Sequence, residues 1–356
     1  MSKPDISRRA SNRDRQTSGG RARLICTILL SIIAAASIAW ARPQGLDQTS
    51  GPPPPPGAPG AQTAGSANGN KGGYTIQANV NLVVLHASVL DDRGVFVPGL
   101  KQDDFRVYED KVQQTLSVFK QEDVPVSVGL VIDNSGSMRD KRPQVNAAAL
   151  TFVETSNPAD EAFVVNFNDD YYLDTEHDFT SDIEEMKEAL ERIDARGSTA
   201  LYDAVIGSLD HLKKGHKDKK VLLVITDGED DFSHHSLADT ITEARHSDAI
   251  IYAIGVYGSD DTKSDKRKGQ RALEALADAT GGAAFFPEDV GDTEAICTQI
   301  AHDIRNQYTL AYYPTNSAQD GTFRSVLVQV FPPRGMSKLT VRTRSGYYAH
   351  QATPAD

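Results

Sequence analysis

The chain has 356 residues, a formal net charge of −12 at pH 7 and two cysteines. This length allows two ordinary domains, or one larger domain with appended segments, so we expect a substantial buried core. Residues 1–41 carry seven basic and two acidic side chains, which leaves the rest of the chain with a net charge of −17. A chain this acidic is a poor nucleic-acid binder, and we predict no nucleic acid among its partners.

The first 41 residues have the features of an export signal. Basic residues precede an apolar run from Leu24 to Trp40, and the run ends in the small-x-small cleavage pattern Ala39-Trp40-Ala41. The run is close to the minimum length that spans a bilayer, so this segment is either a signal peptide or a signal anchor that tethers the chain to a membrane through residues 24–41. Both alternatives predict an extracytoplasmic protein, whether periplasmic, envelope-associated or secreted.

Residues 42–73 are predicted to form a disordered linker. They are mostly Pro, Gly, Ser, Ala, Gln and Asn, with prolines at every position from 52 to 56, and they offer almost nothing to bury. Cys26 lies in the export segment and Cys297 stands alone, so the exported body is expected to have no internal disulfide. Cys297 has helical spacing with Ile300 and Ile304, which favours a place in the core.

Residues 74–124 are predicted to form an N-terminal β segment. Apolar residues alternate between Val80 and Leu90 and are followed by a turn at 91–94, and two short strands at 105–108 and 116–119 follow. No stretch of this segment has the period of a helix.

The pattern changes at Pro125. Val126–Ile132 is a nearly continuous apolar run, typical of a strand buried on both faces of a parallel sheet. Apolar strands then alternate with amphipathic helices as far as Tyr308, which predicts a doubly wound, mostly parallel α/β sheet with helices on both faces. The further strands are predicted at 163–167, 221–226, 250–256 and 285–286, and the helices at 183–193, with Ser181 and Glu184 as its capping box, 200–212, 237–245, 272–279 and 296–304.

The helical period ends at Tyr308, and alternating strands are predicted at 309–313, 325–331 and 339–344. We assign the α/β domain to residues 125–313, a C-terminal β segment to 314–350 and a tail to 351–356. We hypothesise that the two β segments, before and after the α/β domain, pair into one small β-sandwich.

Short oxygen-bearing side chains follow three predicted elements of the α/β domain. Asp133, Ser135 and Ser137 come at alternate positions after the first buried strand, Thr199 precedes the helix 200–212, and Asp227 follows the strand 221–226. The carboxyl edge of a parallel sheet is where ligands bind in open α/β folds. Two carboxylates and three hydroxyls, without imidazole or thiolate, suit one divalent cation of the hard type: Mg²⁺ foremost, with Mn²⁺ or Ca²⁺ as alternatives.

This order and spacing resemble the metal ion-dependent adhesion site of von Willebrand factor type A (VWFA) domains and integrin inserted domains. The resemblance covers Pro125 to about Pro314, roughly half the chain. More narrowly, the run from Asp123 to Met138, with Asp104-Phe105, Glu109-Asp110 and Gly346-Tyr347-Tyr348, resembles the acidobacterial VWFA-related family, which has no settled biochemical role.

The resemblance implies a role for each site residue. Ser135, Ser137 and Thr199 coordinate the cation directly or through water. Asp133 and Asp227 neutralise the charge of the cation and orient the site around it. The carboxylate of an Asp or Glu on a protein partner completes the coordination sphere. The residues 229–232 and a loop at 258–269 that carries Lys263, Lys266, Arg267 and Lys268 either form part of the surrounding binding surface or are simply a solvated, charged surface.

Enzymatic and nucleotide-binding functions fit the sequence poorly. An Mg²⁺-dependent phosphohydrolase of the haloacid dehalogenase type, kept as a minor alternative, needs a second carboxylate where this chain has Ser135. A serine hydrolase needs Gly-x-Ser-x-Gly, and the phosphate-binding glycine motifs of nucleotide sites are missing as well. We predict a non-enzymatic adhesion module that binds protein and no nucleotide; a structural or assembly subunit of an envelope complex is the alternative.

Overall fold

The computed structural model describes residues 82–192, 195–228, 230–258, 261–333 and 338–351. The chain divides into two compact units, 1–73 and 74–356, and all the described residues lie in the second. The predicted export segment, the predicted linker and residues 352–356 of the predicted tail lie outside the described residues. Among the residues that are described, no helix has the length and apolar character needed to cross a membrane.

The α/β part is built on one six-stranded sheet. Its order is β10-β9-β8-β5-β6-β7, and every pairing is parallel except that of β7 with β6. The predicted fold class is therefore confirmed. The strands are β5 (Val126–Asp133), β6 (Glu161–Phe167), β7 (Tyr171–Leu173), β8 (Lys219–Thr226), β9 (Ile250–Gly255) and β10 (Ala284–Phe285).

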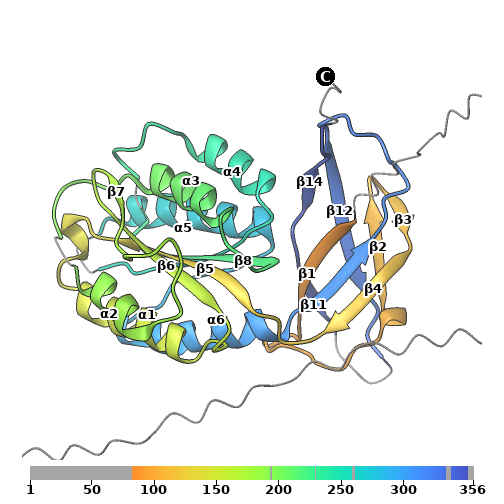
Figure 1. Ribbon diagram of the computed structural model, residues 1–356, viewed down its shortest axis with the longest axis horizontal. Helices are drawn as coiled ribbons and strands as arrows, with labels where there is room; N and C mark the ends of the chain where they lie inside the picture. Colours follow the sequence, from red (N-terminus) through yellow and green to blue (C-terminus); the bar gives the residue numbers. More distant parts are fainter. Residues whose placement is uncertain (1–81, 193–194, 229, 259–260, 334–337, 352–356) are drawn as a thin grey trace, which may run out of the picture. The chain divides into compact units, whose positions relative to one another are not determined.

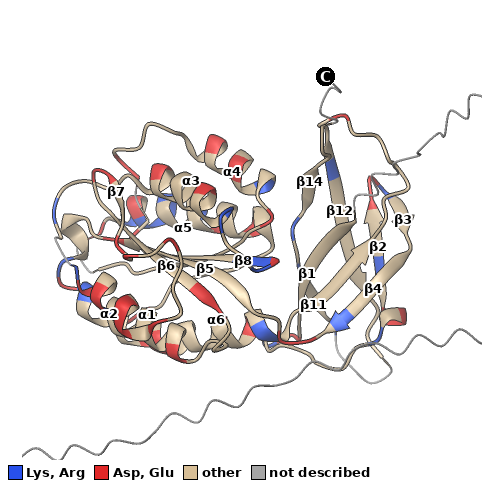
Figure 2. Cartoon of the chain, viewed as in Figure 1, with Lys and Arg blue, Asp and Glu red and all other residues tan. Residues whose placement is uncertain are grey.

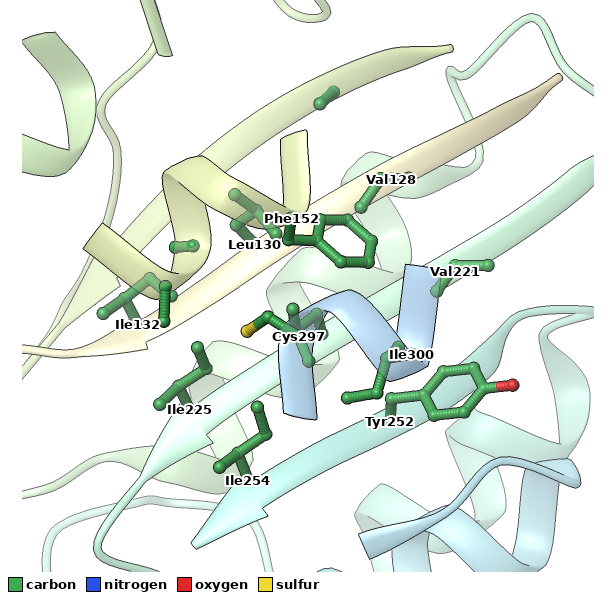
Figure 3. Packing of buried hydrophobic residues seen from close by; sticks show 14 of the residues in the cluster. Val128, Leu130, Ile132, Phe152, Val221, Ile225, Tyr252, Ile254, Cys297 and Ile300 are labelled. Atoms are coloured by element: carbon green, nitrogen blue, oxygen red, sulfur yellow. The ribbon is translucent and has the colours of Figure 1, made fainter. Parts of the chain in front are cut away.

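Helices cover both faces of this sheet (Figure 1). One face packs against α1 (Arg142–Glu154), α2 (Ile183–Glu191) and α6 (Thr293–Asn306), and the other against α3 (Leu201–Leu212), α4 (Leu237–His246) and α5 (Lys263–Thr280). The strands alternate their apolar side chains between two separate cores, as a sheet buried on both faces requires. In the first core, Cys297 and Ile300 of α6 lie over Val221 and Ile225 of β8 (Figure 3), so the predicted core position of Cys297 is confirmed.

Three details of the helices differ from the predictions. Helix α1 was not predicted, although Val145, Ala148, Ala149 and Phe152 have helical spacing and are buried. Helix α5 begins at Lys263, nine residues before its predicted start, because its first turns are charged and carry little apolar signal. The cap of α2 is Asp182, whose side chain accepts the backbone N–H of Glu184, and the predicted cap at Ser181 is wrong.

The remaining strands form two four-stranded sheets that enclose a third core. Their orders are β13-β1-β11-β4 and β14-β12-β2-β3. The strands are β1 (Val83–Leu90), β2 (Phe105–Glu109), β3 (Val112–Gln114), β4 (Leu116–Gln121), β11 (Tyr308–Tyr312), β12 (Phe323–Val330), β13 (Thr340–Arg342) and β14 (Gly346–Tyr348). Each sheet contains strands from before and after the α/β domain, so the hypothesised pairing is correct. β11, which precedes the predicted boundary at 313, pairs with β1 and β4 in the first of these sheets.

The end of α6 connects the α/β part to these antiparallel sheets. Gln307, between α6 and β11, donates to Ser88 Oγ at 3.1 Å and to Tyr252 Oη at 3.2 Å. At the amino end of β8, Lys219 donates from Nζ to the carbonyl of Ile304 at 2.5 Å. Basic positions at the beginning of β8 and at the end of α6 are marked in Figure 2. The amino end of the central sheet is thus tied to the last turn of α6.

Lys219→Met should change how stability depends on pH. Burial lowers the pKa of Lys219 from 10.5 to about 7, and the opposing attraction of Asp123 and Asp160 is weaker. Between these pH values the unfolded chain keeps a proton that the folded protein has released, so the wild type should become more stable as pH rises from about 7 to about 10. Urea unfolding across this range should show the rise in the wild type and a flatter profile in Lys219→Met. The exposed Lys213→Met serves as the control, and a profile unchanged by Lys219→Met would contradict the prediction.

Candidate metal site

Asp133 lies at the carboxyl end of β5, and its carboxylate is fully buried. One oxygen, Oδ1, accepts the backbone N–H of Ser135 at 2.8 Å, and the other, Oδ2, accepts the hydroxyl of Thr226 at 2.6 Å. Thr226 ends β8, the strand that pairs with β5 through Ile132 and Ile225. The parallel register therefore fixes the carboxylate between two strand ends.

The electrostatics of this carboxylate favour a bound cation. Burial and, after it, the nearby charge of Asp227 raise the pKa of Asp133 to about 6, against the opposing effect of the hydrogen bonds from Ser135 and Thr226. Two ionised carboxylates this close together repel each other in a site with little water. A divalent cation between them would offset both charges.

Ser135 and Ser137 bring two hydroxyls to the same place. The chain leaves β5 into the short 3₁₀ helix Gly136–Met138, and Ser135 Oγ lies 3.1 Å from Ser137 Oγ. Ser135 is buried, whereas Ser137 is exposed. Asn134, which directly precedes Ser135, has a buried Oδ1 without a hydrogen-bond partner among the described residues. The loop therefore presents several oxygens around Asp133.

Thr199 reaches this edge through contacts between two loops. The carbonyl of Gly197, a residue with φ of +75°, accepts the backbone N–H of Gly136 at 3.2 Å. Thr199 itself is buried, and its backbone N–H donates to Asp231 Oδ1 at 2.8 Å. The loop with Thr199 thus lies against the loop with Ser135 and Ser137, as predicted from the order of the strands.

Asp227 directly follows β8 and is 8% exposed. Its Oδ2 lies 3.4 Å from the ammonium of Lys141, which sequence reasoning did not place in the site. The two residues are separated by 86 positions, so no local spacing signals their contact. All five predicted residues thus lie on or beside loops at the carboxyl edge of the sheet.

Arg142 is a second residue that the sequence pattern did not reveal. Its side chain is fully buried, and its guanidinium donates to the carbonyl of Asp133 at 3.4 Å, to Asn166 Oδ1 at 2.8 Å and to the carbonyl of Leu190 at 3.3 Å. Burial lowers the pKa of Arg142 to about 10, and the charges of Asp133 and Asp174 oppose this. Arg142 therefore supports the backbone of Asp133 from within the protein.

Most of the charged residues predicted to surround the site form hydrogen bonds with other loops or belong to a helix. Asp230 and Asp231 accept hydrogen bonds from the backbone of Tyr202 and Thr199 and so anchor loops. Glu229 lies outside the described residues. The predicted loop 258–269 is wrong in its second half, because Lys263, Lys266, Arg267 and Lys268 belong to α5.

The donor set fits a cation that prefers oxygen. Within the described part of the chain, no cluster of three or more His, Cys, Asp or Glu side chains is arranged to hold a metal. The loops at the sheet edge bring two carboxylates together with serine and threonine hydroxyls instead, a combination suited to Mg²⁺ and poorly suited to zinc or copper.

Comparison with known proteins agrees with this fold. Residues 128–229 match the family model of the von Willebrand factor type A domain. The match runs from β5 to just beyond β8 and includes all five predicted ligands. This part of the chain is therefore similar to a von Willebrand factor type A domain.

A curated relative, an uncharacterized protein of Synechocystis sp., is 29% identical over 187 residues, which are 51% of this chain and 42% of the relative. The chain thus spans about two fifths of the length of the curated relative it matches.

Three solved structures are similar to parts of this chain. A von Willebrand factor type A protein from Catenulispora acidiphila is 14% identical, covers 75% of each chain and has a TM-score of 0.46. The conserved hypothetical protein BatB from Bacteroides thetaiotaomicron is 17% identical over 50% of this chain and 98% of its own, with a TM-score of 0.41. The vWF domain of a type V pili tip protein from Porphyromonas gingivalis is 13% identical over 51% of this chain and 95% of its own, with a TM-score of 0.43.

Arg142→Met should destabilise the protein. The substitution leaves Asn166 Oδ1 without its buried donor, whereas the carbonyl of Leu190 keeps its hydrogen bond from Asn146. The unsatisfied acceptor should reduce the free energy of unfolding by about 1–3 kcal/mol. Arg139→Met is the matched control, because the exposed Arg139 donates to the carbonyl of Ala195 at the surface. Urea unfolding measures both variants, and equal stability of the two would contradict the structural role of Arg142.

Proposed function

We propose that this protein is an exported, divalent-cation-dependent binding module that captures an acidic side chain of a protein partner. The observation that carries the proposal is the meeting of Asp133, Ser135 and Ser137 with Asp227 at the carboxyl edge of one sheet. We assign the cation as Mg²⁺, with Ser135, Ser137 and Thr199 as ligands, directly or through water. Asp133 and Asp227 neutralise it.

The charge of the site explains why the partner would be acidic. Two carboxylates only balance a divalent ion, and the neutral hydroxyls leave it able to attract another anionic oxygen. Ser137 is exposed while Asp133 is fully buried, so the ion would be reached from the side of Ser137. An Asp or Glu carboxylate approaching there would complete the coordination.

The surroundings of the serines support binding rather than hydrolysis. The hydroxyl of Ser135 lies against that of Ser137, and the lysine of the same loop, Lys141, lies against Asp227, so these contacts do not give either serine the base that a nucleophile would need. Export is supported by the basic and apolar sequence of residues 1–41. Together these features favour adhesion outside the cytoplasm over catalysis.

Isothermal titration of the purified full-length chain with Mg²⁺, Mn²⁺ and Ca²⁺ tests the proposal. The wild type should bind one equivalent of a divalent cation, and Asp133→Ala should bind none, because it lacks the carboxylate that β5 holds in place. Ser137→Ala removes a proposed ligand of the cation, so it should weaken binding at least as much as the loss of an outer-shell partner, which costs about 10–100-fold.

The control is Asp140→Ala, which removes an exposed carboxylate from the same loop and should leave cation binding unchanged. Failure of the wild type to bind any of the three cations, both alone and with an aspartate-containing peptide, would refute the proposed function.

A further inference from the structure

Lys141 holds a positive charge against one of the two proposed metal-site carboxylates. Its Nζ lies 3.4 Å from Asp227 Oδ2 and 3.9 Å from Asp261 Oδ2. The side chain of Lys141 is only 15% exposed, and that of Asp227 is 8% exposed. This ammonium is therefore not a solvated surface charge, and water screens its interaction with Asp227 only partly.

The backbone that carries Lys141 is part of the serine loop. The backbone N–H of Lys141 donates to the carbonyl of Met138 at 2.9 Å, and its own carbonyl accepts the N–H of Val145 at 3.1 Å. Lys141 is also the residue from which α1 begins. Its side chain thus starts from a fixed point three residues after the 3₁₀ turn Gly136–Met138.

The second carboxylate, Asp261, belongs to a different loop. Its Oδ2 accepts the backbone N–H of Gly258 at 2.5 Å, so Asp261 is held by the segment that follows β9. The ammonium of Lys141 lies between this carboxylate and Asp227. Both carboxylates are therefore within 3.9 Å of the same ammonium.

A divalent ion and this ammonium make competing demands on Asp227. Both are positive, both would lie beside the same carboxylate, and their mutual repulsion is strong where water is partly excluded. Binding of the ion is therefore opposed as long as Lys141 remains on Asp227. An additional carboxylate, supplied by a partner, would weaken the repulsion between the ion and the ammonium. With Asp133 and Asp227, it would balance the three positive charges of the ion and Lys141.

We propose that Lys141 is a tethered cation that competes with the divalent ion for Asp227, moves toward Asp261 when the ion binds, and then helps to hold the partner's carboxylate. The proposal rests on the proposed function of the site. Its consequence is cooperativity: the ion binds weakly alone and more tightly with an acidic partner, and the partner's carboxylate is held by two positive charges.

Titration of the full-length chain with Mg²⁺ alone tests the competition. Lys141→Met keeps the length of the side chain and removes its charge, so Mg²⁺ should bind about tenfold more tightly than to the wild type. Lys141→Arg keeps the charge and should bind Mg²⁺ like the wild type. A purely structural role of Lys141 predicts the opposite for Lys141→Met, namely weaker binding from a disturbed loop.

Asp261→Asn provides a second, opposite test. This variant removes the alternative partner of Lys141 and leaves the ammonium with Asp227 alone, so Mg²⁺ should bind less tightly than to the wild type. The two substitutions affect the same ion pair but should shift the Mg²⁺ affinity in opposite directions.

The role toward the partner is tested with N-acetyl-aspartate amide, titrated into each protein at saturating Mg²⁺. Lys141→Met should bind this carboxylate more weakly than the wild type although it binds Mg²⁺ more tightly. If the wild type binds Mg²⁺ and Lys141→Met binds it equally or more weakly, the proposed competition is wrong, but the proposed metal site is not contradicted. Absence of Mg²⁺ binding in the wild type and every variant, with and without the carboxylate, would instead overturn both the proposed function and this inference.

Discussion

The structure of the candidate site depends on a buried carboxylate held between two parallel strands. Asp133 ends β5, and the hydroxyl of Thr226 at the end of β8 fixes one of its oxygens. Both strands lie inside the sheet and are buried along almost their whole length. Gly129 makes this possible, because a Cβ there would lie 2.5 Å from the ring of Phe163 and 2.7 Å from Leu222. The packing of β5 thus sets the position of its terminal carboxylate.

Positive charges on two sides make that burial tolerable. Arg142 donates to the backbone carbonyl of Asp133 from within the protein, and Lys141 lies against Asp227 near the surface. The two residues are adjacent in sequence at the start of α1, so one helix end supplies both charges. They differ in their contacts: the guanidinium donates to three acceptors, whereas the ammonium has two carboxylates within reach. The proposed exchange between partners therefore concerns Lys141 and not Arg142.

The sequence predicted those parts of the site that depend on local pattern. An apolar strand followed by Asp133, Ser135 and Ser137 is a contiguous signal, and the parallel sheet then places Asp227 at the same edge. Lys141 and Arg142 escaped prediction because their partners lie far away in the chain and a basic residue near a helix start is unremarkable. The fold shows the same division. The alternation of strands and helices was predicted correctly, but the first turns of α5 are charged and gave no apolar signal. β11 follows α6 directly, so the sequence did not show that it pairs with the antiparallel strands.

β8 links the candidate site to the antiparallel sheets. Its last residue, Thr226, holds Asp133, and its first, Lys219, bonds to the carbonyl of Ile304 in the last turn of α6. Two residues after that turn, β11 enters the antiparallel sheet between β1 and β4. The residues between Lys219 and Thr226 are packed on both sides, so the two ends of β8 are joined by a closely packed strand. β8 therefore connects the edge that holds Asp133 to the last turn of α6 and, through that turn, to the antiparallel sheets.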